Sequence, residues 1–385
     1  MLALRLIRGS RPKALFRRLL LAAAAGCVGF LLLAALSHAL QYPDRAGASA
    51  VRLLWCLVPL AAVVHYAVTV ARSHPDPGAR SALDAAGADS PSLPALAAVS
   101  TAVACLLGSA LALLVHLHLR GDLTGLPFDG AANELVAADR EMPVPAALTL
   151  LLVLPVAASA ASAVALRPRP PQPGSAPGEP SRPSGTHPSH GLPWGAALIA
   201  FGLALEAFSG REAAQMPLPG AAEGLPAGIA AGWILVGLGL TLAGPALMHF
   251  AGRLLAAGRP GAARLLGGRA LQEEAPRLGR PLGVLCAVAA GAVCAFHVYG
   301  STEALGPLTV LGGLVVLVCT SAAVLGTAAD ARAARAPADL LLRRLGAPGS
   351  LRRGSVALRL TALAAVLGPL TWALAQLAAL PLATA

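Results

Sequence analysis

The chain contains a single lysine, Lys13, among its 385 residues. A P-loop that binds ATP has the form GxxxxGK[ST], in which the lysine reaches the β- and γ-phosphates. Lys13 lies in Gly9-Ser10-Arg11-Pro12-Lys13-Ala14, which does not fit that form. We therefore expect no Walker A site in this chain. We also expect that the chain is not an enzyme and that any ATP hydrolysis belongs to a separate subunit.

Charged and aromatic residues are also scarce, at 12% and 4% of the chain. A soluble domain carries about a quarter charged residues, so this composition excludes an ordinary soluble enzyme. The net charge is +11, but no basic tract is interleaved with aromatic residues, which argues against nucleic-acid binding. With 56% hydrophobic residues and a mean hydropathy of +0.70, the chain is predicted to be a polytopic protein of the lipid bilayer.

Nine segments are apolar for long enough to cross a hydrocarbon core of about 30 Å, which needs about 20 residues. They are 19–40, 51–71, 94–118, 144–166, 193–210, 227–249, 281–299, 307–329 and 356–380. All nine are expected to be helices, because lipid offers backbone groups no hydrogen-bond partner and no segment alternates like a barrel strand. The predicted fold class is all-α, with about nine transmembrane helices.

The cations are unevenly divided between the two sides of these spans. If the N-terminus is cytoplasmic, 23 Arg and Lys residues lie on the cytoplasmic side and five on the other. The positive-inside rule favours that orientation. The abundance of Ala, Gly, Pro and Arg indicates GC-rich bacterial DNA, so we expect the cytoplasmic (inner) membrane. The first span imitates a signal peptide, but because eight further spans follow we interpret it as uncleaved.

A proline-rich segment divides the chain, with nine prolines in residues 167–193, as is typical of a semi-rigid linker. Each side of it has a basic segment suited to the membrane surface (4–18 and 263–280). Each side also has a cytoplasmic loop before a further span (82–88 and 341–347), which together form a weak internal repeat. We predict a first half of four spans, a cytoplasmic linker, two connecting spans and a second half of three spans. These parts are 1–166, 167–192, 193–250 and 251–385.

Small residues inside the spans indicate packing. All six cysteines fall within predicted spans, and no CxxC or Cys/His cluster is present, so we expect no metal and no other cofactor. In the sixth span, glycines favour close contact between helices; they are Gly228, Gly232, Gly237 and Gly239.

Ionisable residues inside a membrane are costly and are candidate functional sites. His65 lies well inside the second span, where we favour a packed histidine bonded to a helix carbonyl. Glu206, one turn from the outer end of the fifth span, is a candidate for binding a cation or a proton, although we favour solvation at the interface. His116, near the outer end of the third span, is expected at the interface. These residues do not converge on a proton relay.

Two stretches of the second half resemble the FtsX-like permease family, the membrane subunits of MacB-type ABC transporters, in an actinobacterial-style two-half version. Residues 335–347, RAPADLLLRRLGA, are similar to the family's short cytoplasmic helix "DLALLRALGA". Residues 263–277, ARLLGGRALQEEAPR, resemble the "ARLALRNLRRNPRR" segment that leads into a span. The first half matches more loosely, through 4–18 and 82–88.

The resemblance implies a permease whose cytoplasmic helices dock into a separate P-loop ATPase. The implied contact residues are Leu340, Leu341, Leu342, Arg343, Arg344, Leu345, Gly346 and Ala347, with a weaker twin at Leu83, Gly87 and Ala88. Gly346 is expected to end its helix as the C′ residue. The alternative is that this helix lies on lipid headgroups with its arginines on phosphates.

The chain departs from the family pattern in three ways. The first loop has lost most of its arginines, the large outer domain of MacB is absent, and the usual final span is missing. The expected activity is the export or extraction of an amphipathic substrate by an ABC transporter. A secondary transporter or another non-ABC membrane protein stays open as the alternative, as does assembly into a dimer.

Overall fold

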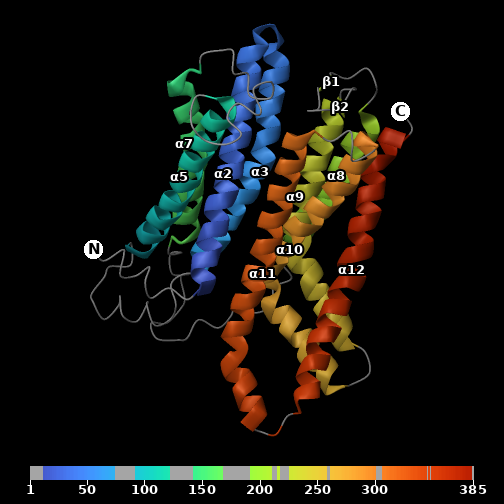
Figure 1. The fold of residues 1–385 in the computed structure, drawn as a ribbon. Helices are drawn as coiled ribbons and strands as arrows, with labels where there is room; N and C mark the ends of the chain where they lie inside the picture. Colours follow the sequence, from blue (N-terminus) through green and yellow to red (C-terminus); the bar gives the residue numbers. More distant parts are fainter. Residues whose placement is uncertain are drawn as a thin grey trace. The chain divides into compact units, whose positions relative to one another are not determined.

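The computed structural model describes residues 12–73, 92–121, 142–167, 191–209, 215–216, 225–257, 261–300, 306–344, 346 and 348–383. Within these ranges the chain is almost entirely helical (Figure 1). The elements are α2 (Pro12–Gln41), η1 (Pro43–Arg45), α3 (Ala46–Arg72), α5 (Ser92–Arg120), α7 (Val144–Ala165), α8 (Gly191–Phe208), β1 (Gln215–Met216), β2 (Leu225–Pro226), α9 (Ala227–Ala257), α10 (Ala262–Tyr299), α11 (Pro307–Arg344) and α12 (Gly349–Ala383). In this described part, nine helices are long and apolar enough to cross a membrane. The protein is an all-α polytopic membrane protein, as its composition predicts.

Each predicted span overlaps one of these nine helices, but several helices continue further than predicted, α10 and α11 by the most. The segment 263–280, expected to lie on the membrane surface, is the first part of the continuous helix α10. The segment 335–344, expected to belong to a separate short helix, is the end of α11. The structure also contains a short antiparallel pairing that the sequence did not predict, in which Gln215 faces Pro226 and Met216 faces Leu225.

The chain forms two compact units. The first contains α2, α3, α5 and α7 with residues 307–323 of α11. Within it, α2 contacts the other three complete helices. Leu33, Ala112, Ala147 and Leu151 form a buried core between α2, α5 and α7. The small residues of this core allow long apolar helices to pack closely along their length.

A histidine that we expected at the interface is buried inside the first unit. His116 on α5 is 0% exposed, and its Nε2 lies 3.3 Å from the Ser37 hydroxyl oxygen on α2. Its ring meets that of Phe30 edge to face, with 5.9 Å between the ring centres. Ser37, far away in sequence, supplies His116 with a polar partner between the helices.

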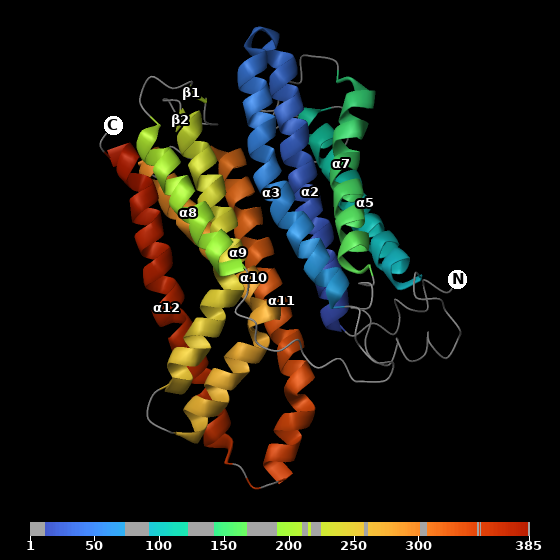
Figure 2. The same ribbon diagram turned by 180° about the vertical axis from the view of Figure 1, so that it is seen from behind.

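The second unit contains α8, α9, α10, α12 and the rest of α11, and α9 contacts α8, α10 and α12. Helices α8 and α9 run side by side in both views (Figure 2). They meet through glycines: Gly232 lies against the carbonyl of Gly202, and Gly239 lies against the carbonyl of Gly195. This confirms the close packing predicted from the glycines of the sixth span.

Glycines also line the contact between α9 and α10. Gly244 lies against the backbone of Gly279, and Gly252 lies against that of Gly268. Gly268 and Gly279 belong to the segment 263–280, which was predicted to lie on the membrane surface. Their contact with α9 explains why this segment is instead part of the continuous helix α10. The first part of α10 buries its small residues against α9, and its backbone is thereby held in the helix.

Two glycines of α10 predict opposite effects of the same substitution. Alanine is favoured over glycine in a helix by about 1 kcal/mol. A Cβ at Gly279 would collide with the backbone of Pro245 and Gly244, whereas a Cβ at Gly291 would meet nothing. We expect Gly279→Ala to lower the free energy of unfolding by about 1–3 kcal/mol, because overpacking forces the backbone to move. The thermal midpoint measured in detergent should therefore fall. Gly291→Ala is the matched control and should raise the midpoint slightly. Equal effects at the two positions would contradict the α9–α10 contact.

Candidate functional site

Three helices of the second unit are longer than a membrane requires. Helices α10 and α11 have 38 residues each and α12 has 35. At 1.5 Å per residue they measure about 52–57 Å, against about 30 Å of hydrocarbon. Their Asp, Glu and Arg residues all lie at one end, in 262–280 of α10, 330–344 of α11 and 349–359 of α12. We call these three segments the helical extension; in Figure 1 they lie together.

The helical extension has an apolar core of its own. Leu271 and Ala275 of α10 are buried together with Ala331 of α11 and Leu255 of α9. Leu358 of α12 packs against the same cluster. Four helices therefore share one core where their charged residues begin. Helices α10 and α12 also pack against each other, whereas α11 joins this core through Ala331.

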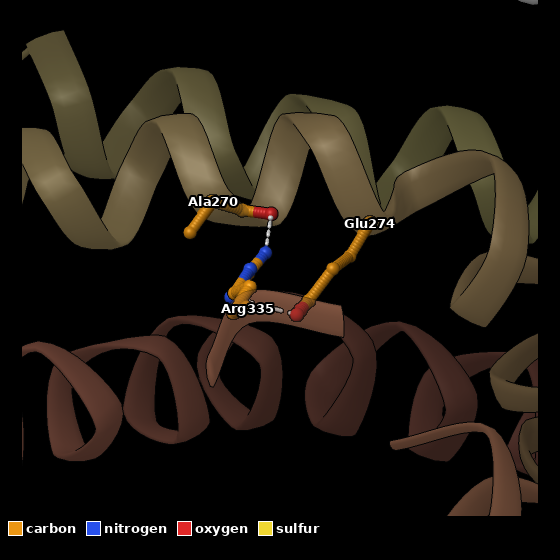
Figure 3. Close-up of polar contacts among 3 residues, drawn as sticks. All are labelled: Ala270, Glu274 and Arg335. Atoms are coloured by element: carbon orange, nitrogen blue, oxygen red, sulfur yellow. Dashed lines mark hydrogen bonds and ion pairs between the residues drawn. The ribbon is translucent and has the colours of Figure 1, made fainter. Parts of the chain in front are cut away.

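An arginine of α11 fastens that helix to α10 (Figure 3). The guanidinium of Arg335 lies 2.7 Å from Oε1 of Glu274 and donates a second hydrogen bond, of 2.8 Å, to the carbonyl oxygen of Ala270. The side chains of Arg335 and Glu274 are only 22% and 14% exposed. Charge-assisted hydrogen bonds of this kind are the strong ones, and they resist screening when they are partly buried. We call this contact the Arg335 clamp.

Beyond the clamp, α11 ends in exposed leucines. Leu340 and Leu341 are 53% and 59% exposed, and Arg344 is exposed as well. Ala329 is the last residue of α11 before its charged residues begin. Leu341 lies 12 residues after it, or about 18 Å further along the helix. The helix ends at Arg344, and Gly346 follows with φ +84°, in the left-handed region where glycine is favoured. This confirms Gly346 as the C′ residue.

The other predicted contact residues lie outside what the structure describes. Leu342 and Arg343 belong to the helix, but their side-chain positions are not described. Leu345 and Ala347 fall outside the described residues, as does the predicted twin in the first half, at Leu83, Gly87 and Ala88.

The two intramembrane candidates lie in different units. His65 of α3 is partly buried, and its Nε2 has no hydrogen-bond partner among the described residues. Glu206 of α8 is 1% exposed, and neither carboxyl oxygen has such a partner. We expected interfacial solvation for Glu206. That expectation was wrong, because α9 covers the side chain.

The Arg335 clamp is not apparent from the sequence alone. Arg335 stood within the stretch that resembles the permease family, but Glu274 had no assigned role. Its one visible signal is that Glu273 and Glu274 are the acidic residues of an otherwise basic segment, 262–280. A carboxylate among arginines is a candidate for an ion pair.

The described residues contain no metal site of the usual kind. All six cysteines are free thiols within helices. No three His, Cys, Asp or Glu side chains gather in the described part of the chain. Comparisons with protein-family models, with curated proteins and with solved structures give no match for this chain.

Proposed function

We propose that the protein is the permease subunit of an ABC transporter with an FtsX-like architecture. A separate P-loop ATPase would bind the end of α11, and nucleotide-driven movement of that ATPase would reach the membrane helices through the helical extension. The observation that carries the proposal is the pair of exposed leucines, Leu340 and Leu341, at the end of an extension about 18 Å beyond the apolar part of α11.

An exposed apolar pair at the end of a charged segment is a candidate contact for a partner. Two adjacent leucines that face water at the end of a charged segment expose apolar surface that binding would bury, at about 25 cal/mol per Å². Arg344 beside them and Arg353 at the start of α12 are exposed cations. A partner surface with an apolar pocket and acidic residues around it would therefore fit this end of the protein.

The Arg335 clamp supports mechanical coupling. It lies five residues, or about 8 Å of helix, before Leu340, so a force on the leucines reaches α10 through one ion pair and one hydrogen bond. The shared core of α9, α10, α11 and α12 lies directly behind it. The substrate class that we propose is an amphipathic molecule, exported or extracted from the outer leaflet.

The proposed location is the bacterial cytoplasmic membrane, with the N-terminus and the helical extension in the cytoplasm. The support is the distribution of cations, with 23 Arg and Lys residues on that side and five on the other. This orientation is also the one that lets an ATP-hydrolysing partner reach Leu340 and Leu341.

Purification of the tagged chain from its own host in mild detergent tests the proposal. We expect a stoichiometric P-loop ATPase in the preparation and ATP hydrolysis above background. Because ATP is cytoplasmic, capture of that partner through the end of α11 would also fix the orientation. A chain that purifies alone and does not hydrolyse ATP would overturn the proposal and leave the secondary transporter as the better candidate.

A further inference from the structure

A carboxyl group is enclosed between two helices of the second unit. Glu206 lies on the face of α8 that contacts α9, one turn after Gly202. The residue opposite is Gly232, and its missing side chain leaves the space that the Glu206 side chain fills. A Cβ at Gly232 would collide with Cγ of Glu206. The glycine thus makes room for the carboxyl, which is 1% exposed.

This carboxyl differs from the other acids that the structure describes. It is the one Asp or Glu among the described residues that is fully buried, whereas Glu274 pairs with Arg335 and Glu273 is exposed. Neither oxygen of Glu206 has a hydrogen-bond partner in the described part of the chain. Buried ionised carboxylates are found paired with a cation or bound to a metal, because an unpaired charge loses its hydration without compensation.

The described groups around Glu206 supply no cation paired with it. On α10 the titratable groups at this end are Cys294, His297 and Tyr299; His297 is exposed, and its Nδ1 lies 2.8 Å from the Val293 carbonyl oxygen of its own helix. Glu206 is the one titratable residue of α8. On α9 the titratable groups are His249 and Arg253, which are 17 or more residues beyond Gly232, or at least about 25 Å along the helix.

On α12 the last titratable residue is Arg359. It lies 16 residues before Ala375, the residue of α12 whose carbonyl oxygen accepts a hydrogen bond from the thiol of Cys294 on α10. The thiol of Cys294 is within electrostatic range of Glu206 but supplies no positive charge.

A bound cation fits the site less well than a proton. A metal ion needs several oxygen or nitrogen ligands, and no cluster of three such side chains surrounds Glu206 among the described residues. A proton needs only the carboxylate itself. Protonation removes the charge that the apolar surroundings disfavour, and the neutral group still fits opposite Gly232.

We propose that Glu206 is a proton-binding site enclosed by α8 and α9, at which the carboxylate takes one proton from water and stays neutral while the two helices are in contact. A movement that separates α8 from Gly232 of α9 would hydrate the carboxyl and release the proton. The ligand is therefore a proton, and the site does not depend on the function proposed above.

The test is infrared spectroscopy of the purified protein at neutral pH in a detergent without ester groups, with wild type compared with Glu206→Gln. We expect the wild-type spectrum to contain a carboxylic acid C=O stretching band that shifts in heavy water, and the variant to lack it. Glu273→Gln is the matched control. Because Glu273 is exposed, its replacement should lower the two carboxylate bands by the contribution of one group and leave the acid band unchanged.

The outcomes that would overturn the proposal are distinct. Loss of carboxylate bands in Glu206→Gln would mean that Glu206 is ionised. Absence of an acid band from wild type alone would mean the same, so the test does not depend on the variant. Glutamine reproduces the shape and neutrality of the protonated group, and a Glu206→Gln chain that no longer folds would mean that the fold requires the negative charge.

Discussion

Replacing Leu340 and Leu341 together by aspartate should abolish recovery of the proposed ATPase partner while the chain still inserts and folds. Fully burying an exposed leucine contributes about 1.5–3 kcal/mol. Because these two are 53% and 59% exposed, the pair accounts for about 2–3 kcal/mol, or roughly 30- to 150-fold in affinity. Carboxylates at these positions would also repel a surface that is complementary to Arg344. Because both leucines are more than half exposed, the substitutions remove no internal contact of consequence.

The measurement is the ratio of ATPase to chain after purification, together with the elution profile of the chain. Ala333→Asp combined with Ala334→Asp is the matched control, since it adds the same two charges at exposed positions two turns earlier on the same faces of α11. The control should retain the ATPase. Undiminished recovery in the double variant would remove the end of α11 from the proposed contact.

Breaking the Arg335 clamp should weaken the second unit and uncouple the end of α11 from α10. Arg335→Glu places two carboxylates against each other and leaves the carbonyl of Ala270 without its donor. Hydrogen bonds to charged groups contribute about 1.5–3 kcal/mol, so a loss of about 2–3 kcal/mol is expected. The thermal midpoint should fall by several degrees, and the rate of ATP hydrolysis in the purified complex should fall with it.

A charge exchange isolates the ion pair. Arg335→Glu combined with Glu274→Arg restores opposite charges but not the bond to Ala270, because glutamate has no N–H group to donate. We therefore expect partial recovery, with a coupling free energy of about 1 kcal/mol or more in the double-mutant cycle. Arg332→Glu is the control, because it reverses a charge at an exposed position of the same helix. It should change neither the thermal midpoint nor the rate of ATP hydrolysis. No recovery in the double variant would mean that the clamp acts through Ala270 alone.

The transmembrane helices could be predicted from the sequence because one physical requirement dominates them. A segment in hydrocarbon has to be apolar for about 20 residues and has to bond its own backbone groups. The end of α11 was predictable for a similarly local reason, since Gly346 is followed by Pro348 and both disfavour further helix.

The contacts between helices could not be predicted in the same way. Glu206 is buried because Gly232, 26 residues later, has no side chain, and nothing in the residues around Glu206 indicates that. The continuity of α10 was hidden for a related reason. Arginine, alanine and leucine favour a helix equally on a membrane surface and in a folded extension, so contact with α9 decides between the two.

The glycine contacts of α9 also define what a distant relative of this chain has to keep. On α8 the contact positions Gly195 and Gly202 are seven residues apart, and on α9 their counterparts Gly232 and Gly239 are seven residues apart as well. Side chains at these positions would separate the backbones and expose Glu206. Most apolar positions of a membrane helix accept any of several aliphatic residues, so overall identity between homologues can fade. Selection for this helix pair would instead retain two G-x6-G patterns joined by a segment of variable length, with an acid four residues after the first.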